Sequence, residues 1–399
     1  MGRHLRLTAR VLRDGKLQRI TFFVKTVPID NSHRFIVMDS NVFGTEATVY
    51  KKYAPMFNSC LPPGWTFPVA KCYLTRGPQS EGLKNSTTED EEVIILEDLT
   101  ARGYRNRENF PPMDLPHCRI VMKTMATFHA ASILLEESRK KSHPGDFNAS
   151  IDLYPEIKEN FLVYNEGHVG YECIRLSAET MATAVFKLWP DKFKDVSRNE
   201  VLEAIRGAWM EVFEMVKPSK EYPNVLNHGD PWTNNILFSY ETGREGREVP
   251  VDAKFVDLQI GRYAPPVLDI LIFTHACTRR DFRERHMKEI LEFYHRALGE
   301  ILPQQVLDEV LPLERLFEMC HRYRDFGRVI STAYLPIILS ENDPLISGGD
   351  NATAPLDIEQ AVYSDRGDKI AENCVKSESY RRWITESFQE CLEILNLWT

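Results

Sequence analysis

The sequence lacks the features that mark zinc-binding, disulfide-rich, membrane-spanning and secreted proteins. The eight cysteines include no C-x-x-C pair, which argues against a zinc site and a compact disulfide framework. No stretch approaches the roughly 18 consecutive apolar residues of a membrane span, and the charged N-terminus does not fit a signal peptide. We therefore expect a cytoplasmic protein with reduced thiols and no membrane span.

An excess of basic residues is also missing. The 49 lysines and arginines stand against 58 aspartates and glutamates, and the resulting net charge of −9 repels a polyphosphate backbone. Nucleic acid is therefore not expected as a partner, and no feature points to an obligate protein partner. The 43% hydrophobic content is that of a globular protein, and 399 residues are enough for two or three packed units.

The first hundred residues have mostly strand patterns. Apolar and polar residues alternate over 5–11, and Asp14-Gly15 predicts a tight turn before a second strand over 20–27. Residues 43–53 have helical spacing, with Glu46 on the packing face. Two further strands are expected within 68–75 and 93–99. Together these elements predict a small α+β unit over residues 1–105.

The remaining residues, 106–399, have mostly helical patterns. The expected helices fall within 113–138, 171–188, 198–216, 279–298 and 380–397. Strand-like runs return between 225 and 256, and residues 340–354 have the composition of a loop.

The segment N-H-G-D-P-W-T-N-N-I-L-F, residues 227–238, gives the clearest chemical signal. His228, Asp230 and Asn235 have the spacing H-x-D-x-x-x-x-N, in which kinases use the aspartate to accept a hydroxyl proton and the asparagine to bind Mg²⁺. The apolar residues that follow would anchor the loop in the core. A turn whose polar side chains bond to their own backbone is the alternative.

A second carboxylate, Asp257, follows the apolar run F-V. Phosphoryl transfer needs a further oxygen ligand for Mg²⁺. A hairpin formed by 236–240 and 253–257 would bring Asp257 to the same end as Asn235. An ordinary turn or capping role is the alternative for this aspartate.

Lys25 and Glu46 form another candidate pair. In kinases a lysine on a central strand, paired with a helical glutamate, orients the nucleotide phosphates. Taken singly, Lys25 could be a strand-end lysine with a solvated amine, and Glu46 an acid near a helix N-terminus. Both residues stand in the kinase order relative to Asp230 and Asp257, which favours the shared explanation.

Taken together, these segments resemble the ecdysteroid kinase-like family, whose relatives include choline kinases and aminoglycoside phosphotransferases. The resembling blocks extend over nearly the whole chain: F-F-V-K-T-V-P, F-G-T-E-A-T-V-Y, I-I-L-E-D-L, M-A-T-F-H-A-A-S, L-N-H-G-D-P-W-T-N-N-I-L-F and F-V-D-L-Q-I-G-R-Y-A-P-P-V-L-D-I. The resemblance implies an α+β, bilobal protein kinase-like fold. A small, mostly antiparallel nucleotide-binding lobe would occupy 1–105, and a mainly helical catalytic and substrate lobe would occupy 106–399.

The resemblance also implies roles for single residues of the catalytic lobe. Asp230 would be the catalytic base, and His228 would brace its loop. Asn235 and Asp257 would bind Mg²⁺. Asp269 would support the catalytic loop from a helix, although an acid at a helix N-terminus is an adequate alternative.

For the nucleotide, the resemblance implies that Lys25 and Glu46 orient the phosphates of ATP. Glu97, Asp98 and Leu99 would belong to the hinge, where backbone groups hold the adenine. The fold also has a strand and a glycine-rich turn ahead of the strand pair that leads to the lysine. Only Gly2 and Gly15 precede Lys25, without a G-x-G-x-x-G, so we expect a lobe that lacks its first strand and Gly-rich loop.

The sequence therefore predicts an ATP- and Mg²⁺-dependent phosphotransferase that acts on a hydroxyl group of a small molecule. The segment after Asp257 lacks D-F-G and A-P-E, which argues against protein substrates. The resemblance suggests a steroid such as an ecdysteroid, or another lipophilic alcohol. The alternative is a catalytically silent kinase-fold protein that binds a small molecule or a partner. A hydrolase is disfavoured because the chain has no G-x-S-x-G.

Overall fold

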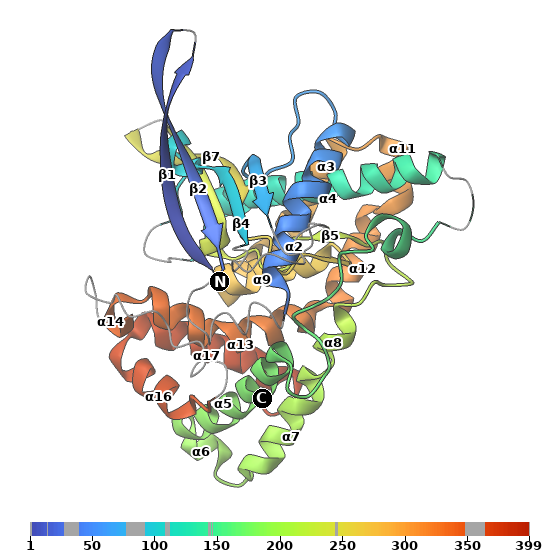
Figure 1. Ribbon diagram of the computed structural model, residues 1–399. Helices are drawn as coiled ribbons and strands as arrows, with labels where there is room; N and C mark the ends of the chain where they lie inside the picture. The colour runs from blue at the N-terminus through green and yellow to red at the C-terminus, as the bar shows by residue number, and fades with distance from the viewer. Residues whose placement is uncertain are drawn as a thin grey trace, which may run out of the picture.

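A small sheet-containing lobe stands against a larger helical lobe in the computed structural model (Figure 1). The structure describes residues 2–13, 15–27, 40–76, 92–107, 112–142, 145, 147–243, 246–347 and 364–398. This arrangement confirms the predicted α+β fold class, with a small antiparallel lobe followed by a mainly helical one. None of the described helices is long and apolar enough to cross a membrane.

The small lobe contains a four-stranded antiparallel sheet in the order β1-β2-β4-β3. Its strands are β1 (Arg3–Arg13), β2 (Lys16–Thr26), β3 (Cys72–Arg76) and β4 (Val93–Glu97). β1 and β2 pair along their whole length and project from the body of the lobe (Figure 1). The predicted hairpin is thus confirmed, with Gly15 at a φ of 73° in its turn. Asp14 lies outside the described residues.

The expected helix over 43–53 is part of a longer helical segment. It consists of α2 (Val42–Thr48), the π-helical turn η1 (Val49–Tyr53) and α3 (Ala54–Cys60). Glu46, Val49, Tyr50 and Tyr53 are all buried, as their spacing predicts. A single carboxylate among three packing residues therefore points into the protein.

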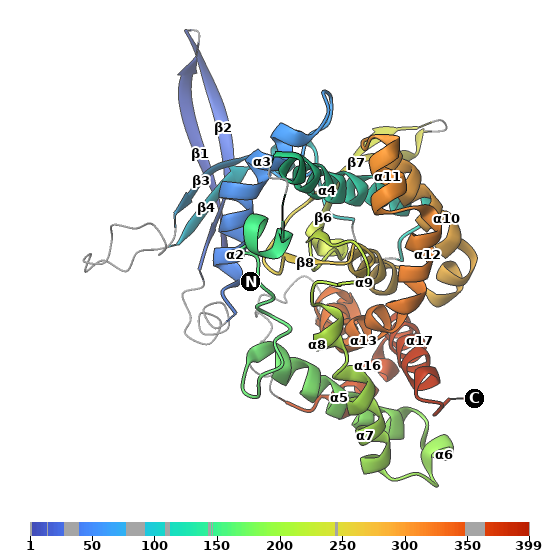
Figure 2. The same cartoon turned by 90° about the vertical axis from the view of Figure 1, so that its right-hand side faces the viewer.

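The helical lobe follows a short 3₁₀ turn, η2 (Leu99–Arg102), and is built around α4 (Leu115–Ser142). α4 contacts α3 on one side and α10 on the other, so it joins the two lobes (Figure 2). The other helical elements are η3 (Ala149–Leu153), α5 (Val169–Leu188), α6 (Pro190–Phe193), α7 (Arg198–Trp209), α8 (Val212–Met215), η4 (Thr233–Asn235), α9 (Val267–Cys277), α10 (Arg280–Gly299), α11 (Gln304–Val310), α12 (Leu313–Arg322), α13 (Arg324–Asn342), α14 (Pro344–Ser347), α16 (Gly367–Lys376) and α17 (Glu378–Ile394).

The prediction of a loop over 340–354 is wrong for residues 340–347, which the structure describes. Residues 340–342 continue α13, and α14 begins directly at Pro344. A proline at the first helical position loses no hydrogen bond, because that N–H has no partner within the helix. Residues 348–354 lie outside the described part of the chain. The single helix expected over 198–216 is likewise two, α7 and α8.

Two short antiparallel pairs carry the segments around the predicted catalytic loop. β5 (Val225–Asn227) pairs with β8 (Arg262–Ala264), and β6 (Ile236–Thr242) pairs with β7 (Glu248–Phe255). Ile236 lies opposite Phe255, and the Val256 N–H donates to the Asn235 carbonyl at 3.0 Å. The predicted hairpin is therefore confirmed, and Asn235 and Asp257 lie at its same end.

The hydrophobic core continues from one lobe into the other. The largest buried cluster includes Ile94 of β4, Phe128 of α4 and Phe255 of β7. Arg105 and Phe238 also exchange backbone hydrogen bonds of 2.9 and 2.8 Å across the junction. The division at residue 105 therefore stays a prediction, because packing runs across it.

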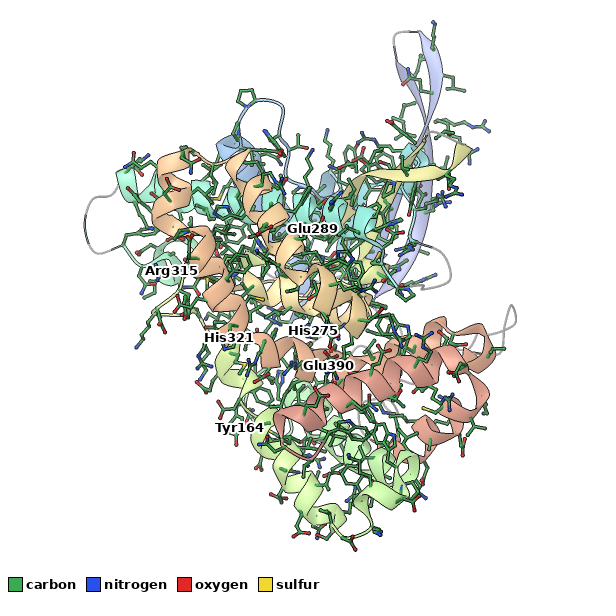
Figure 3. The ribbon with its side chains drawn as sticks, turned by 180° about the vertical axis from the view of Figure 1, so that it is seen from behind. Tyr164, His275, Glu289, Arg315, His321 and Glu390 are labelled. Carbon is green, nitrogen blue, oxygen red and sulfur yellow. The ribbon has the colours of Figure 1, made fainter. Side chains whose placement is uncertain are left out.

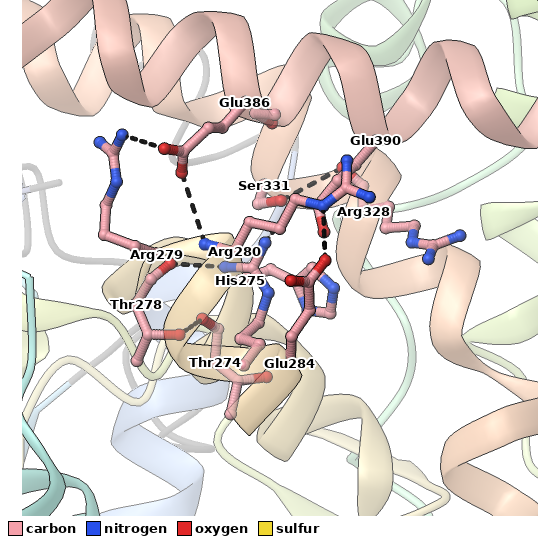
Figure 4. Close-up of polar contacts among 12 residues, drawn as sticks. Thr274, His275, Thr278, Arg279, Arg280, Glu284, Arg328, Ser331, Glu386 and Glu390 are labelled. Atoms are coloured by element: carbon pink, nitrogen blue, oxygen red, sulfur yellow. Dashed lines mark hydrogen bonds and ion pairs between the residues drawn. The ribbon is translucent and has the colours of Figure 1, made fainter. Parts of the chain in front are cut away.

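Buried ion pairs attach the last helix to the core of the helical lobe. Arg279 pairs with Glu386, and Arg283 pairs with Glu390, so the α9–α10 junction is tied to α17 (Figure 4). His275 lies beside this cluster, and burial lowers its pKa well below the usual range (Figures 3 and 4). A Cβ on Gly327 of α13 would lie 2.7 Å from the His275 ring nitrogen. A glycine there lets α13 pack closely on α9.

Phe128→Ala should destabilise both lobes. The Phe128 ring packs against Phe67, Phe255 and His228 at centroid distances of 4.6, 5.8 and 6.3 Å. We expect a loss of about 3–5 kcal/mol in the free energy of unfolding, because the cavity would not refill. Leu12→Ala, at a side chain that is 74% exposed, should change it by less than about 0.5 kcal/mol. Similar denaturation midpoints for the two variants would contradict this role of Phe128.

Candidate active site

The loop that carries His228 and Asp230 is held from below by a buried carboxylate on α9. Asp269 Oδ2 accepts the His228 N–H at 2.7 Å, and Oδ1 accepts the Gly229 N–H at 2.9 Å. Burial alone would raise the pKa of Asp269. The hydrogen bond from His129, together with the charge interactions with His129 and His228, lowers this pKa below its usual value. A carboxylate that accepts two backbone N–H groups fixes the course of the loop, as the predicted support role requires.

A histidine that the sequence interpretation assigned no role completes this support. His129 of α4 donates from Nε2 to Asp269 Oδ2 at 3.2 Å, and its Nδ1 lies 2.8 Å from the Tyr294 hydroxyl. His129 and Tyr294 are both fully buried. The signal was present in M-A-T-F-H-A-A-S, where a histidine interrupts an apolar helix, but nothing nearby in the sequence identified its partner.

His228 links the catalytic loop to the segment that carries Asp257. Its Nδ1 accepts the Asp230 N–H at 3.2 Å, so its other nitrogen, Nε2, is the donor to the Val256 carbonyl at 3.0 Å. Burial lowers the pKa of His228, which keeps the ring neutral. Both nitrogens of the ring are used within the protein, and the bracing role of His228 stays a prediction.

Asp230 has one oxygen engaged and one open. Oδ2 accepts from the Trp232 indole at 3.1 Å and from Asn235 Nδ2 at 2.8 Å. Within the described part of the chain, no hydrogen bond reaches Oδ1. Burial and the charge of Asp257 raise the pKa of Asp230 to about 7, although its two donors oppose the shift. A carboxylate with such a pKa and a free oxygen can take up a proton. Trp232, which had no assigned role, helps to orient it.

Lys25, Glu46 and Asp257 converge from β2, α2 and the end of β7. The Lys25 ammonium lies 2.6 Å from Glu46 Oε2 and also forms an ion pair with Asp257 Oδ1. Burial would lower the pKa of Lys25, but the two carboxylates raise it, so the amine stays charged. Lys25 therefore joins the predicted lysine–glutamate pair directly to the predicted metal ligand, across 232 residues of sequence.

The oxygens needed for a divalent cation are present at this point. Asn235 uses its Nδ2 to donate to Asp230, and no described residue bonds to its Oδ1. Asp257 has a φ of 67°, an uncommon conformation that turns the chain at the end of β7. The described residues include no group of three or more acidic, histidine or cysteine side chains that could hold a metal ion. The set fits Mg²⁺, which commonly takes one or two protein oxygens together with substrate phosphates.

The predicted hinge residues begin with Glu97, the last residue of β4, which pairs with the strand that carries Lys25. Asp98 Oδ1 accepts from the Thr100 N–H at 3.1 Å, and Asp98 Oδ2 pairs with Arg6 of β1 at 2.9 Å. Glu97 pairs with Arg102 at 2.9 Å. Backbone groups have partners here too, since the Glu97 N–H donates to the Lys71 carbonyl at 2.8 Å and the Tyr104 N–H to the Leu99 carbonyl at 3.1 Å. The hinge role of Glu97, Asp98 and Leu99 stays a prediction.

The comparison with protein families decides the assignment. The model of the ecdysteroid kinase-like family matches residues 1–305. The chain belongs to the ecdysteroid kinase-like family. This confirms the resemblance seen in the sequence, and membership of this family supports a small-molecule phosphotransferase. No curated protein matches the chain.

Two solved structures of another phosphotransferase show a weak likeness. They are GDP complexes of wild-type aminoglycoside 2'-phosphotransferase-IIIa and of a single-residue mutant of it. Each is 10% identical, with a TM-score of 0.37. The alignments cover 98% of this chain and 92% and 90% of those chains, respectively. At this TM-score, no conclusion rests on the likeness.

The part of the family fold that would cover the phosphates was expected to be missing. The turn between β1 and β2 lies at the far end of the hairpin from Lys25, which pairs with His4. Gly2 is the glycine that lies against Lys25, because a Cβ on it would be 3.1 Å from Lys25 Cε. The absence of the Gly-rich loop from this family member stays a prediction.

Gly229→Ala should disrupt the catalytic loop. Gly229 has a φ of 86°, and a Cβ there would lie 2.0 Å from the Ile260 carbonyl oxygen. We expect a loss of about 3 kcal/mol or more in the free energy of unfolding, from strain and overlap together. Gly64→Ala is the matched control, with a φ of 90° and no atom within 4 Å, and should cost about 1 kcal/mol. Equal losses in denaturant unfolding would show that the contact with Ile260 is unimportant.

Asp269→Asn should destabilise the protein in a pH-dependent way. An amide can accept at only one of the two positions, so one buried N–H would face an NH₂ group, at a cost of about 2–3 kcal/mol near pH 7. Because the pKa of Asp269 is lowered in the folded state, its contribution is complete above about pH 5 and is lost as the pH falls through the folded pKa. The difference in melting temperature from wild type should therefore shrink at acid pH. The exposed control Asp368→Asn should show neither effect.

Proposed function

We propose that this protein is an ATP- and Mg²⁺-dependent phosphotransferase that phosphorylates a hydroxyl group of a lipophilic alcohol such as an ecdysteroid. The observation that carries the proposal is the meeting of Lys25 with both Glu46 and Asp257, next to an Asp230 whose Oδ1 is open. In kinases a lysine–glutamate ion pair and a metal-binding aspartate must both be in place for phosphoryl transfer, and Lys25, Glu46 and Asp257 provide these residue types at one point.

On the acceptor side, Asp230 is the group that takes the proton. Its pKa of about 7 suits a base that accepts a proton and releases it again. As the acceptor oxygen forms its bond to the γ-phosphorus of ATP, the bond from that phosphorus to the ADP oxygen breaks, and the hydroxyl proton passes to Asp230 Oδ1. Trp232 and Asn235 hold Oδ2, so the open oxygen keeps its direction during the transfer.

On the nucleotide side, Lys25 donates to phosphate oxygens while Glu46 holds its ammonium in place. Asn235 Oδ1 and Asp257 would hold Mg²⁺, which neutralises charge on the β and γ phosphates when bound. Lys25 must then give up part of its contact with Asp257. His228, braced between Asp230 and Val256, keeps the two metal-binding residues in register.

The acceptor class rests on the family description and on the chain's own sequence. The family is named for ecdysteroid kinase-like activity, and the segment after Asp257 runs into β8 and α9 without the elements that protein kinases use to bind a peptide. A small alcohol is therefore the acceptor that we propose.

Asp230→Asn should lower turnover by about 100- to 10,000-fold, because the amide cannot accept the proton while its oxygen can still bond to Trp232 and Asn235. The measurement is Mg²⁺-dependent ADP release with a panel of sterols and small alcohols. Asp368→Asn, at a side chain that is 74% exposed, is the matched control and should behave as wild type.

Equal turnover by wild type and Asp230→Asn would rule out the proposed base. A wild-type protein that binds ATP in the presence of Mg²⁺ but phosphorylates no alcohol would instead support the catalytically silent kinase-fold protein.

A further inference from the structure

A cavity that has no part in the candidate active site lies in the helical lobe. Its volume is about 290 Å³, close to the lower end of the range of about 300–1,000 Å³ for small-molecule sites. Its walls come from the C-terminal part of α4, the segment just before β5 and the junction of α11 with α12. None of the residues proposed to bind the nucleotide, the metal or the acceptor lines it, so it is a separate place on the protein.

One wall of the cavity presents a guanidinium that is already held in orientation. Arg315 lies on α12, on the face of the protein seen from behind in Figure 3. It donates from Nη2 to the Glu221 carbonyl, and its guanidinium carbon lies 5.7 Å from the centroid of the Tyr222 ring. The Tyr222 hydroxyl donates in turn to Glu318 at 3.0 Å. Among the described residues, no carboxylate forms an ion pair with Arg315, so its charge is left for a ligand.

The wall formed by α4 carries more negative than positive charge. The Lys140 ammonium lies 3.0 Å from Glu136 Oε1 and 3.0 Å from Glu137 Oε1, so one cation serves two carboxylates. The Tyr263 hydroxyl holds Glu136 further, because it donates to Oε2 at 2.8 Å. Glu137 accepts from Lys140 alone within the described part of the chain, which leaves its second oxygen available. This wall therefore favours a cationic group.

Apolar and exposed acidic side chains complete the lining. Ile133, Pro223 and Val310 offer contact to methylene groups, and Glu221 and Glu309 are exposed. Four carboxylates and two cations line the cavity, which disfavours a purely anionic ligand. The unpaired arginine disfavours a purely cationic one. The described residues include no group of acidic side chains that could hold a metal ion, so an organic ligand with both charges fits best.

We propose that this cavity binds a small aliphatic zwitterion, with its carboxylate at Arg315 and its ammonium at Glu137. A guanidinium suits a carboxylate because its fork of donors can meet both oxygens. The methylene groups that separate the two charges of the ligand would lie on the apolar side chains. Such a site goes beyond the proposed function, because none of its residues takes part in phosphoryl transfer.

The walls of the cavity lead directly to the catalytic loop. Asn224 lines the cavity and stands next to β5, the strand that ends at this loop. The Leu226 N–H of β5 donates to Ser132 Oγ on α4 at 2.9 Å. Tyr263, which bonds to Glu136, lies opposite Leu226 in the β5–β8 pair. A ligand that holds α4 against the segment before β5 should therefore reduce the local opening of this segment and of the catalytic loop.

The test is calorimetric binding of 4-aminobutanoate, 5-aminopentanoate and 6-aminohexanoate, without ATP and at low salt, where charge pairs near the surface are least screened. Each zwitterion is compared with the amine and the carboxylate of the same length, such as 1-aminobutane and butanoate. The zwitterion of the best length should bind wild type about tenfold more tightly than either counterpart, the value of one charge-assisted hydrogen bond.

Two variants assign the two charges. Arg315→Gln should remove the advantage of the zwitterion over the amine, and Glu137→Gln should remove its advantage over the carboxylate. Arg285→Gln and Glu203→Gln are the matched controls, at side chains that are 64% and 71% exposed and lie outside the cavity, and should retain both advantages. Melting temperatures without ligand show whether each variant is folded.

Hydrogen exchange locates the bound zwitterion. It should slow exchange over residues 221–229 of wild type and leave exchange in α7 unchanged. The site is overturned if wild type binds no zwitterion, if a counterpart with one charge binds as tightly, or if binding leaves residues 221–229 unprotected. Unchanged affinities in both Arg315→Gln and Glu137→Gln also overturn it. No turnover enters these measurements, so they decide the site whether or not the protein phosphorylates an alcohol.

Discussion

The buried carboxylate of Asp269 is the constraint on which the site depends. It accepts the backbone N–H groups of His228 and Gly229, and so determines where Asp230 lies. His129 and Tyr294 in turn fix the carboxylate from α4 and α10. A charge buried at this depth is stable only because each of its oxygens has donors, and the loop supplies two of them. The loop and its support therefore stabilise each other.

The second constraint is the Lys25 ammonium between Glu46 and Asp257. It connects the sheet lobe to the end of β7, at the place where the proposed nucleotide phosphates would lie. Without phosphates, the two carboxylates are held together by one cation. In the proposed function, bound phosphates would compete for this cation, and Asp257 would then turn toward Mg²⁺. The same ion pair thus keeps the site assembled and leaves its oxygens available for exchange.

The sequence predicted the parts of the site that depend on local order. Asn235 and Asp257 could be placed together because a short hairpin joins them, and Glu46 could be placed inward because its helix has three packing residues on the same face. Lys25, Asp230 and Asp269 were predicted from their motifs, and their functional roles stay predictions. His129 received no role, because its partners Asp269 and Tyr294 lie on elements that are distant in sequence. No pattern within α13 shows that this helix packs closely on α9, since that depends on the space that Gly327 leaves for His275 and Leu271. The end of α13 was mistaken for a loop because its composition is that of a turn, while the helix continues to Asn342.

The ion pairs between the α9–α10 junction and α17 have a consequence for what the family signature describes. The family match ends at residue 305, so α17 lies beyond it. α17 is nevertheless paired with Arg279 and Arg283, which come directly after the helix that carries Asp269. Segments outside the matched region therefore contribute to the packing that supports the catalytic loop, and the signature alone does not include everything that holds the site in place.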